Sequence, residues 1–77
     1  MKAYQGHKNR NAWNVALWIN GEEWLYRLAC EILNQTKTKN EAAEVMVSTL
    51  NNVYGVFETP DGAPYNKTNV RLAFRYM

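Results

Sequence analysis

The side chains best suited to nucleophilic catalysis in this sequence are its one cysteine, Cys30, and its one histidine, His7. A catalytic nucleophile needs a base within hydrogen-bonding reach and a third group that orients the base. Cys30 lies in an apolar segment between Leu25 and Leu33, where a free cysteine is typically a small buried hydrophobic residue. His7 lies in a polar N-terminal stretch. We therefore expect the two side chains to stay apart.

Metal binding and acid–base catalysis find as little support. A structural zinc site needs four cysteine or histidine ligands, and the chain has two candidates. Glu22, Glu23, Glu41 and Glu44 fall at predicted helix starts, where carboxylates interact favourably with the helix dipole. The glycines stand singly at predicted turns, so no phosphate-binding loop is present. The sequence predicts a protein that is not an enzyme and holds neither a metal nor a cofactor.

Basic residues provide one candidate binding surface. Lys67, Arg71 and Arg75 are spaced four residues apart and would line one face of a C-terminal helix, while Lys8 and Arg10 add charge near the N-terminus. Such a stripe can neutralise phosphates. The formal net charge is only +2, which favours an ordinary solvated face. Nucleic-acid binding is therefore the alternative function.

Aromatic residues provide a second candidate surface. The chain has three tryptophans, five tyrosines and two phenylalanines. Their large apolar areas can stabilise a small core that has no disulfide. Exposed tryptophan and tyrosine side chains commonly anchor protein interfaces, so both burial and partner binding are open to them. The candidate interface residues are Trp13, Trp18, Trp24, Tyr26 and Tyr65.

Length and composition bound the architecture. With 77 residues, 47% hydrophobic and 21% charged, the chain is expected to form one folded domain. We predict a basic arm over residues 1–10 and a single helical domain over residues 11–77. The lone cysteine permits no internal disulfide, and the longest apolar run, residues 15–19, is too short to span a bilayer. These features favour a cytoplasmic protein without a membrane partner.

The first predicted element covers residues 12–19. Asn11 is a candidate N-cap, and Trp13, Ala16 and Leu17 would share one face of a helix. Apolar and other residues also alternate over residues 15–19, a period that permits a strand. Both interpretations remain open from the sequence.

The second predicted element is a helix after Asn20-Gly21. Asn20 followed by Glu23 resembles a capping box, and Arg27 and Glu31 have the spacing of an ion pair on its polar face. Apolar residues recur at helical spacing: Trp24, Leu25, Leu28, Ala29, Ile32 and Leu33.

Two further helices complete the predicted domain. A third helix over residues 41–54 would end at Gly55, and a type I turn over residues 59–62 would precede the fourth. Thr68 or Asn69 would cap that last helix. Its buried face would hold Val70, Ala73, Phe74 and Met77. The predicted fold class is mainly α, a bundle of about four short helices with an aromatic-rich core.

Residues 11–26 read NAWNVALWINGEEWLY and follow GHKN, and residues 59–62 read TPDG. These segments resemble a group of small phage-encoded and bacterial proteins of unknown function, which share a motif close to TWNVALWINND-x-x-LY and a later TPDG turn. The chain departs from that motif at Ala12, where threonine is usual, and at Gly21-Glu22, where Asn-Asp is usual. The resemblance implies no catalytic residue and no cofactor.

The resemblance implies instead a protein that acts by binding a component of a host cell. We expect a non-enzymatic phage-type interaction protein, a modulator or inhibitor of a host or anti-phage defence complex such as an anti-CRISPR or anti-restriction protein. The expected partner is a host protein or defence complex in the host cytoplasm. A homodimer would also help so short a chain to bury its rings.

Overall fold

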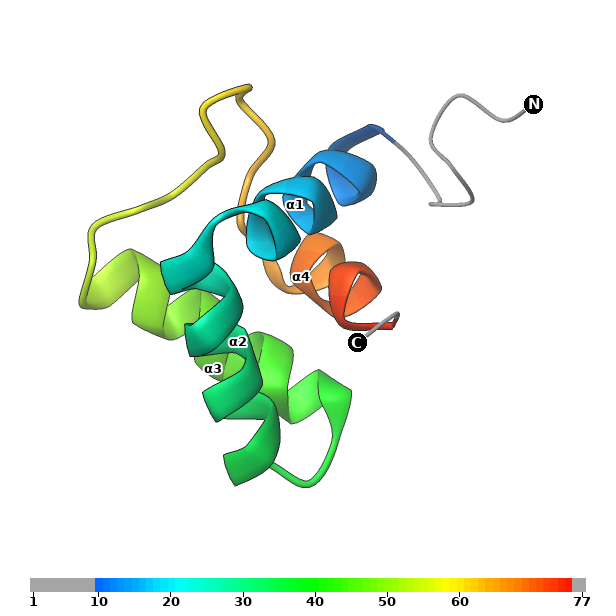
Figure 1. Ribbon diagram of the computed structural model, residues 1–77, viewed down its shortest axis with the longest axis vertical. Helices are drawn as coiled ribbons and strands as arrows, with labels where there is room; N and C mark the ends of the chain where they lie inside the picture. Colours follow the sequence, from blue (N-terminus) through cyan, green and yellow to red (C-terminus); the bar gives the residue numbers. More distant parts are fainter. Residues whose placement is uncertain (1–9, 76–77) are drawn as a thin grey trace.

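The computed structural model of the chain describes residues 10–75, which form four helices (Figure 1). They are α1 (Arg10–Gly21), α2 (Glu23–Gln35), α3 (Lys39–Asn52) and α4 (Lys67–Phe74). α1 packs against α2 and α4, and α3 packs against the same two helices, so the four helices enclose one core. The predicted mainly α bundle of four short helices is confirmed. Within residues 10–75, no helix combines the length and the hydropathy that a membrane span requires.

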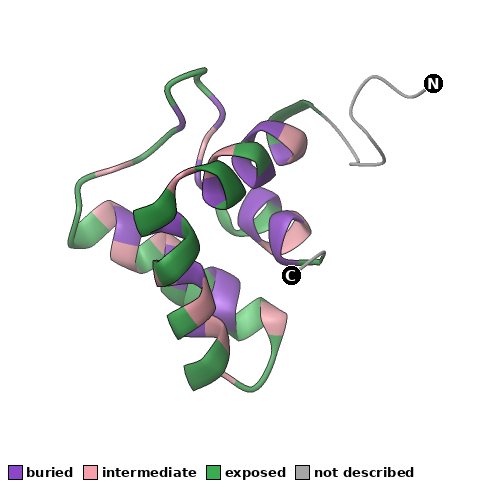
Figure 2. Cartoon of the chain, in the orientation of Figure 1, coloured by how far each residue is buried: buried purple, intermediate pink, exposed green. Residues whose placement is uncertain are grey.

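The core lies along the facing sides of the four helices, where the purple residues gather in Figure 2. Its largest fully buried hydrophobic side chains are Phe74, Ile19, Met46 and Leu50, followed by two valines. Many of the remaining core positions are small alanines. Six lie on the helices and Ala63 lies in the loop before α4: Ala12, Ala16, Ala29, Ala42, Ala43, Ala63 and Ala73. The core is therefore richer in alanine and poorer in rings than the sequence indicates, and most described aromatic side chains lie at or near the surface.

α1 and α2 are separated by one residue. Residues 12–19, for which a helix and a strand were both open, are helical. The predicted capping box at Asn20 is wrong, because Asn20 still belongs to α1 and its side chain donates to the Ala16 carbonyl at 2.9 Å. An N-cap needs extended backbone, which occurs at Glu22 (φ −98°, ψ 121°) and without a side-chain cap bond.

Two further predictions, one about the buried face of α1 and one about an ion pair on α2, are wrong. Leu17, expected to lie on the buried face with Trp13, is 50% exposed. Arg27 pairs with Glu23 at 2.9 Å and not with Glu31. An acidic residue one turn before a basic one is the more favourable order on a helix, which explains this choice. The buried residues of α1 are Ala12, Asn14, Val15, Ala16 and Ile19.

α3 has well-defined ends. Thr38 caps it by accepting a hydrogen bond from the Glu41 amide at 3.1 Å, and the Glu41 carboxylate accepts one from the Lys37 amide at 2.9 Å. The helix therefore begins two residues before the predicted start. At the other end the helix stops at Asn52, two residues before the predicted end at residue 54. Gly55 then adopts φ +67°, a left-handed conformation that glycine takes without strain.

α4 is capped by Asn66, whose side chain accepts a hydrogen bond from the Asn69 amide at 2.8 Å. The predicted caps, Thr68 and Asn69, are wrong because both lie inside the first turn of the helix. Asn69 has another structural role, since its side chain is buried and donates to the Pro64 carbonyl at 2.9 Å.

This assignment predicts that Asn66→Ala lowers the free energy of unfolding by about 1 kcal/mol, the usual effect of removing an N-cap side chain. Thr68→Ala is the matched control two residues away, and we expect it to change stability by less than about 0.5 kcal/mol. Urea unfolding followed by circular dichroism measures both. A larger effect at Thr68 than at Asn66 would contradict the assigned cap.

Candidate functional site

The segment between α3 and α4 is a long loop folded back on itself. Glu58 and Pro64 form an isolated antiparallel bridge. Between them the Gly62 amide donates to the Thr59 carbonyl at 2.9 Å, and Gly62 adopts φ +89°. The predicted turn over residues 59–62 is therefore present. The Thr59 amide also donates to the Ala63 carbonyl at 2.8 Å, which closes the base of the turn.

Side chains of α1 hold this turn against the bundle. The Asn14 Nδ2 group donates to Asp61 Oδ2 at 2.9 Å, and Asn14 Oδ1 accepts a bond from the Thr59 hydroxyl at 2.5 Å. The indole Nε1 of Trp18, one helical turn after Asn14, donates to the same Asp61 oxygen at 3.0 Å. Asn14 and Thr59 are both buried, so this Asn14–Trp18–Thr59–Asp61 network satisfies polar groups that water does not reach.

The network stabilises the ionised form of Asp61. Hydrogen bonds donated first by Asn14 and then by Trp18 hold the pKa of Asp61 below its ordinary value of 3.8, and the positive charge of Arg10 acts in the same direction. Both hydrogen bonds are strongest when the Asp61 carboxylate is ionised. Asp61 is therefore an anchoring charge, and it leaves the two donors fixed in place.

Anchoring the turn creates a groove between the loop and the junction of α1 with α2. Its volume is about 560 Å³, and its floor includes Tyr65, which is only 3% exposed. Burial, and then the nearby charge of Glu22, raise the pKa of the Tyr65 hydroxyl. The lining residues are Trp18, Glu22, Trp24, Leu25, Val56, Glu58, Thr59, Pro60 and Tyr65.

Exposed apolar side chains lie beside this groove, where the start of α2 meets the end of α3. The rings of Trp24 and Tyr54 are in contact, with centroids 5.2 Å apart and planes inclined by 53°. Val53 is 72% exposed and Phe57 is 63% exposed. We call Trp24, Val53, Tyr54 and Phe57 the aromatic face.

The five aromatic residues predicted as interface candidates do not form one surface. Trp24 and Tyr26 are exposed, Trp13 and Trp18 are partly buried, and Tyr65 is buried. Trp18 and Tyr65 contribute to the groove, whereas Tyr26 lines a different hollow on the other side of α2. Only Trp24 belongs to the aromatic face.

Sequence reasoning missed Val53, Tyr54 and Phe57, the most exposed part of this surface. Val53 and Tyr54 continue the apolar spacing of α3, a pattern that predicts burial. The helix ends at Asn52, and the chain turns away at Gly55 before another element can cover them. The signal that indicates this exposure is the stop glycine, which directly follows the two apolar residues.

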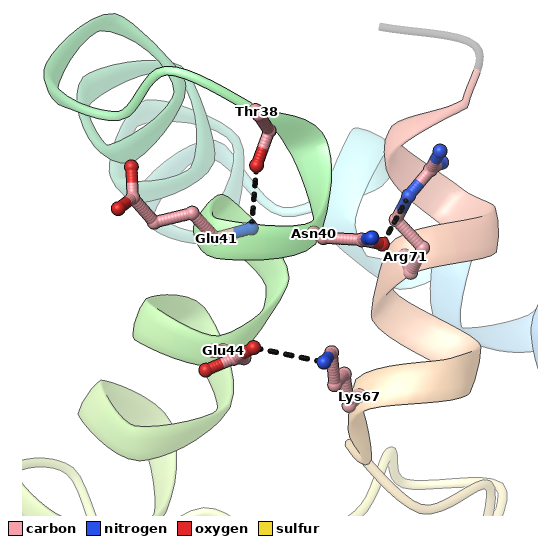
Figure 3. A network of polar contacts seen from close by, with 6 residues as sticks. All are labelled: Thr38, Asn40, Glu41, Glu44, Lys67 and Arg71. Atoms are coloured by element: carbon pink, nitrogen blue, oxygen red, sulfur yellow. Dashed lines mark hydrogen bonds and ion pairs between the residues drawn. The ribbon is translucent and has the colours of Figure 1, made fainter.

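The basic stripe of α4 lies against α3, and Figure 3 shows the contacts between them. Lys67 Nζ forms an ion pair with Glu44 at 2.8 Å, and Arg71 Nε donates to the Asn40 side chain at 2.8 Å. Arg75 is exposed just after the helix. Two of the three cations are thus engaged in helix–helix contacts, which weakens their charge as a phosphate-binding surface.

The other predicted basic residues do not extend this stripe in the described part of the chain. Arg10 opens α1, where its charge acts on Asp61. Lys8 and the rest of the predicted arm before Arg10 lie outside the described residues, as do His7 and Met77.

The catalytic candidates are equally scattered. Cys30 is partly buried in α2, and its interaction with Tyr26 raises the pKa of the Tyr26 hydroxyl. Over residues 10–75, no three side chains of the histidine, cysteine, aspartate or glutamate types lie in an arrangement that could hold a metal ion.

Comparison with known families confirms the resemblance to a family without a known function. The chain belongs to a family of unknown function, DUF7249, whose model matches residues 1–75. Comparison with curated proteins and with solved structures finds no match.

The network predicts that Asn14→Ala lowers the free energy of unfolding by about 1–3 kcal/mol, because Asp61 loses one of its two donors and the buried Thr59 hydroxyl loses the acceptor of its proton. Asn34→Ala is the control, since Asn34 is exposed near the end of α2. Chemical unfolding compares the two variants. Equal, small effects would show that the network does not hold the turn.

Asp61 also predicts a pH dependence. Its folded-state pKa is lower than its ordinary value of 3.8, so deprotonation favours the folded state. The stabilisation is fully present above that ordinary value and is lost as the pH falls through the lower folded-state pKa. The difference in urea midpoint between the wild type and Asp61→Asn should therefore be largest near neutral pH and shrink below pH 3.8. Glu31→Gln, at an exposed position, should follow the wild type throughout.

Proposed function

We propose that this protein is a non-enzymatic interaction protein that binds a protein partner through the aromatic face. The observation that carries the proposal is the exposure of four large apolar side chains at one end of the bundle: Trp24, Val53, Tyr54 and Phe57. Single exposed hydrophobic residues are normal in proteins, but several within residues 53–57, one of them in ring contact with an exposed tryptophan of α2, are characteristic of a binding surface.

The ring contact between Trp24 and Tyr54 favours tight binding for a physical reason. Aromatic side chains offer large contact areas with few rotatable bonds, and two rings already in contact lose little further freedom when a partner covers them. Trp24 extends from the first turn of α2, where Leu25 anchors the helix in the core. Trp24 is thus carried on a helix that the core holds in place.

The resemblance to phage-encoded proteins supports a more specific form of this proposal. A small binding protein of that kind acts on a host protein or on an anti-phage defence complex, as a modulator or an inhibitor, in the host cytoplasm. The aromatic face is the surface that we assign to that contact.

Nucleic-acid binding is the second candidate. A hollow of about 400 Å³ between α3 and α4 is lined by Lys67 and Arg71 together with Asn40, Thr68 and Leu72. This cationic hollow favours a phosphate ligand, whereas the contacts of Lys67 with Glu44 and of Arg71 with Asn40 oppose one, because a phosphate would have to replace them.

Tagged wild-type protein should recover a discrete partner from host lysate after nuclease treatment. We expect Phe57→Ser and Val53→Ser to lower that recovery at least about five-fold, the effect of losing more than 1 kcal/mol of interface energy. Val45→Ser is the matched control, because Val45 is an exposed valine of α3 two turns before Val53. Thermal unfolding of all three variants checks that each remains folded.

Two outcomes would contradict this assignment. Equal recovery with Phe57→Ser and with Val45→Ser would exclude the aromatic face as the contact surface. Recovery of nucleic acid that falls steeply with added salt, and that Arg71→Glu with Arg75→Glu abolishes, would favour the second candidate.

A further inference from the structure

The groove beside the aromatic face has two walls of different origin. One wall comes from the junction of α1 with α2 and presents Trp18, Glu22 and Trp24. The opposite wall comes from the loop between α3 and α4, with Val56, Glu58 and Pro60. In Figure 1 this loop, drawn in yellow to orange, leaves the end of α3 and returns past α1 to α4. Indole surfaces and carboxylates therefore line the same hollow.

The charge of the groove is opposite to that of the chain. The chain carries a formal net charge of +2, yet the groove is lined by two glutamates and by no lysine or arginine. Within residues 10–75 the ion pairs join Glu23 to Arg27 and Glu44 to Lys67. Glu22 and Glu58 have no cationic partner in that part of the chain. The groove thus offers negative charge that the described residues leave uncompensated.

A contrasting hollow lies elsewhere on α2. It has a similar volume, about 590 Å³, and its charged lining residues are Lys37 and Lys39, with no carboxylate. The negative character of the first groove is therefore a local property, and the two hollows should attract ligands of opposite charge.

We propose that the groove lined by Trp18, Glu22, Trp24 and Glu58 binds an arginine side chain on a segment of the partner protein. This inference rests on the proposed function and identifies the chemistry of the partner. A guanidinium group is planar and weakly hydrated, so it stacks on an indole ring while its N–H groups donate to carboxylates. Lysine, whose compact ammonium group is strongly hydrated, gains less from the ring surfaces.

The geometry of the groove supports a site that exists before the partner arrives. The indole N–H of Trp18 is already bonded to Asp61, which fixes the orientation of that ring. The Asn14 bonds to Asp61 and Thr59 hold the loop wall at its distance from α1. A prearranged site loses less conformational entropy on binding than one that must form around its ligand.

The test is a titration, followed by NMR, of the ¹⁵N-labelled full chain with a short peptide that carries two arginines and otherwise only uncharged residues. We expect saturable shifts of the Trp18 and Trp24 indole signals and of the amides near Val56 and Glu58. Glu22→Gln and Glu58→Gln should each weaken binding about three-fold, as for one exposed ion pair, and both together about ten-fold. Glu31→Gln removes the same charge from an exposed site of α2 outside the groove and should leave the affinity unchanged.

A matched lysine peptide separates arginine recognition from simple charge attraction, and we expect it to bind more weakly. Equal affinity for lysine, equal weakening by Glu31→Gln, or the absence of shifts in the groove would each overturn the proposal. The lysate experiment distinguishes this failure from that of the proposed function. Partner recovery that depends on Phe57 but not on Glu22 and Glu58 would overturn the groove alone, whereas peptide binding without any recovered partner would overturn the interaction role.

Discussion

The hydrogen bonds between Asn14 of α1 and the turn residues Thr59 and Asp61 join parts of the chain that are 45 and 47 residues apart. The loop that contains this turn has no regular element apart from one isolated bridge, so its own backbone cannot determine where it lies. Ordering such a loop costs conformational entropy, and the buried Asn14 amide and Thr59 hydroxyl, together with the exposed Asp61 carboxylate, offset that cost by bonding to one another. These bonds add to the packing of Ala63 and Tyr65 in the core, which also holds the loop, and they fix the turn that forms one wall of the groove against α1.

The same interaction brings together the two separate segments of the sequence that carry the resemblance. Asn14 and Trp18 belong to the segment that resembles the first motif, and Thr59 and Asp61 belong to the TPDG turn. In the folded chain these four side chains form one network. Gly62 completes the turn with φ +89°, a conformation that a larger residue adopts only with strain. Residues of both segments are therefore accounted for first by folding: they place the loop, and the placed loop forms a wall of the groove.

The helices could be predicted from the sequence because local spacing determines them. Apolar periodicity located α2 and α3, although α3 begins and ends two residues before its predicted bounds. The caps at Asn20 and Thr68 were predicted wrongly, since an N-cap depends on where the backbone leaves the extended region, which residue types alone do not specify. The site was harder still. Whether Tyr54 is covered or exposed depends on which element lies over the last turn of α3, and whether Trp18 is free or anchored depends on Asp61, 43 residues away.

The distribution of charge partners argues for a protein ligand and against a phosphate ligand. On the α4 side, Lys67 and Arg71 already contact α3, so a phosphate would compete with bonds that help to hold two helices together. In the groove, Glu22 and Glu58 have no cationic partner within residues 10–75, so an incoming cation has no such bond to replace. Electrostatic attraction of this kind guides association and selects partners more than it adds affinity. The apolar contacts of Trp24, Tyr54 and Phe57 would then provide most of the binding energy, while the groove would decide which charged segment fits beside them.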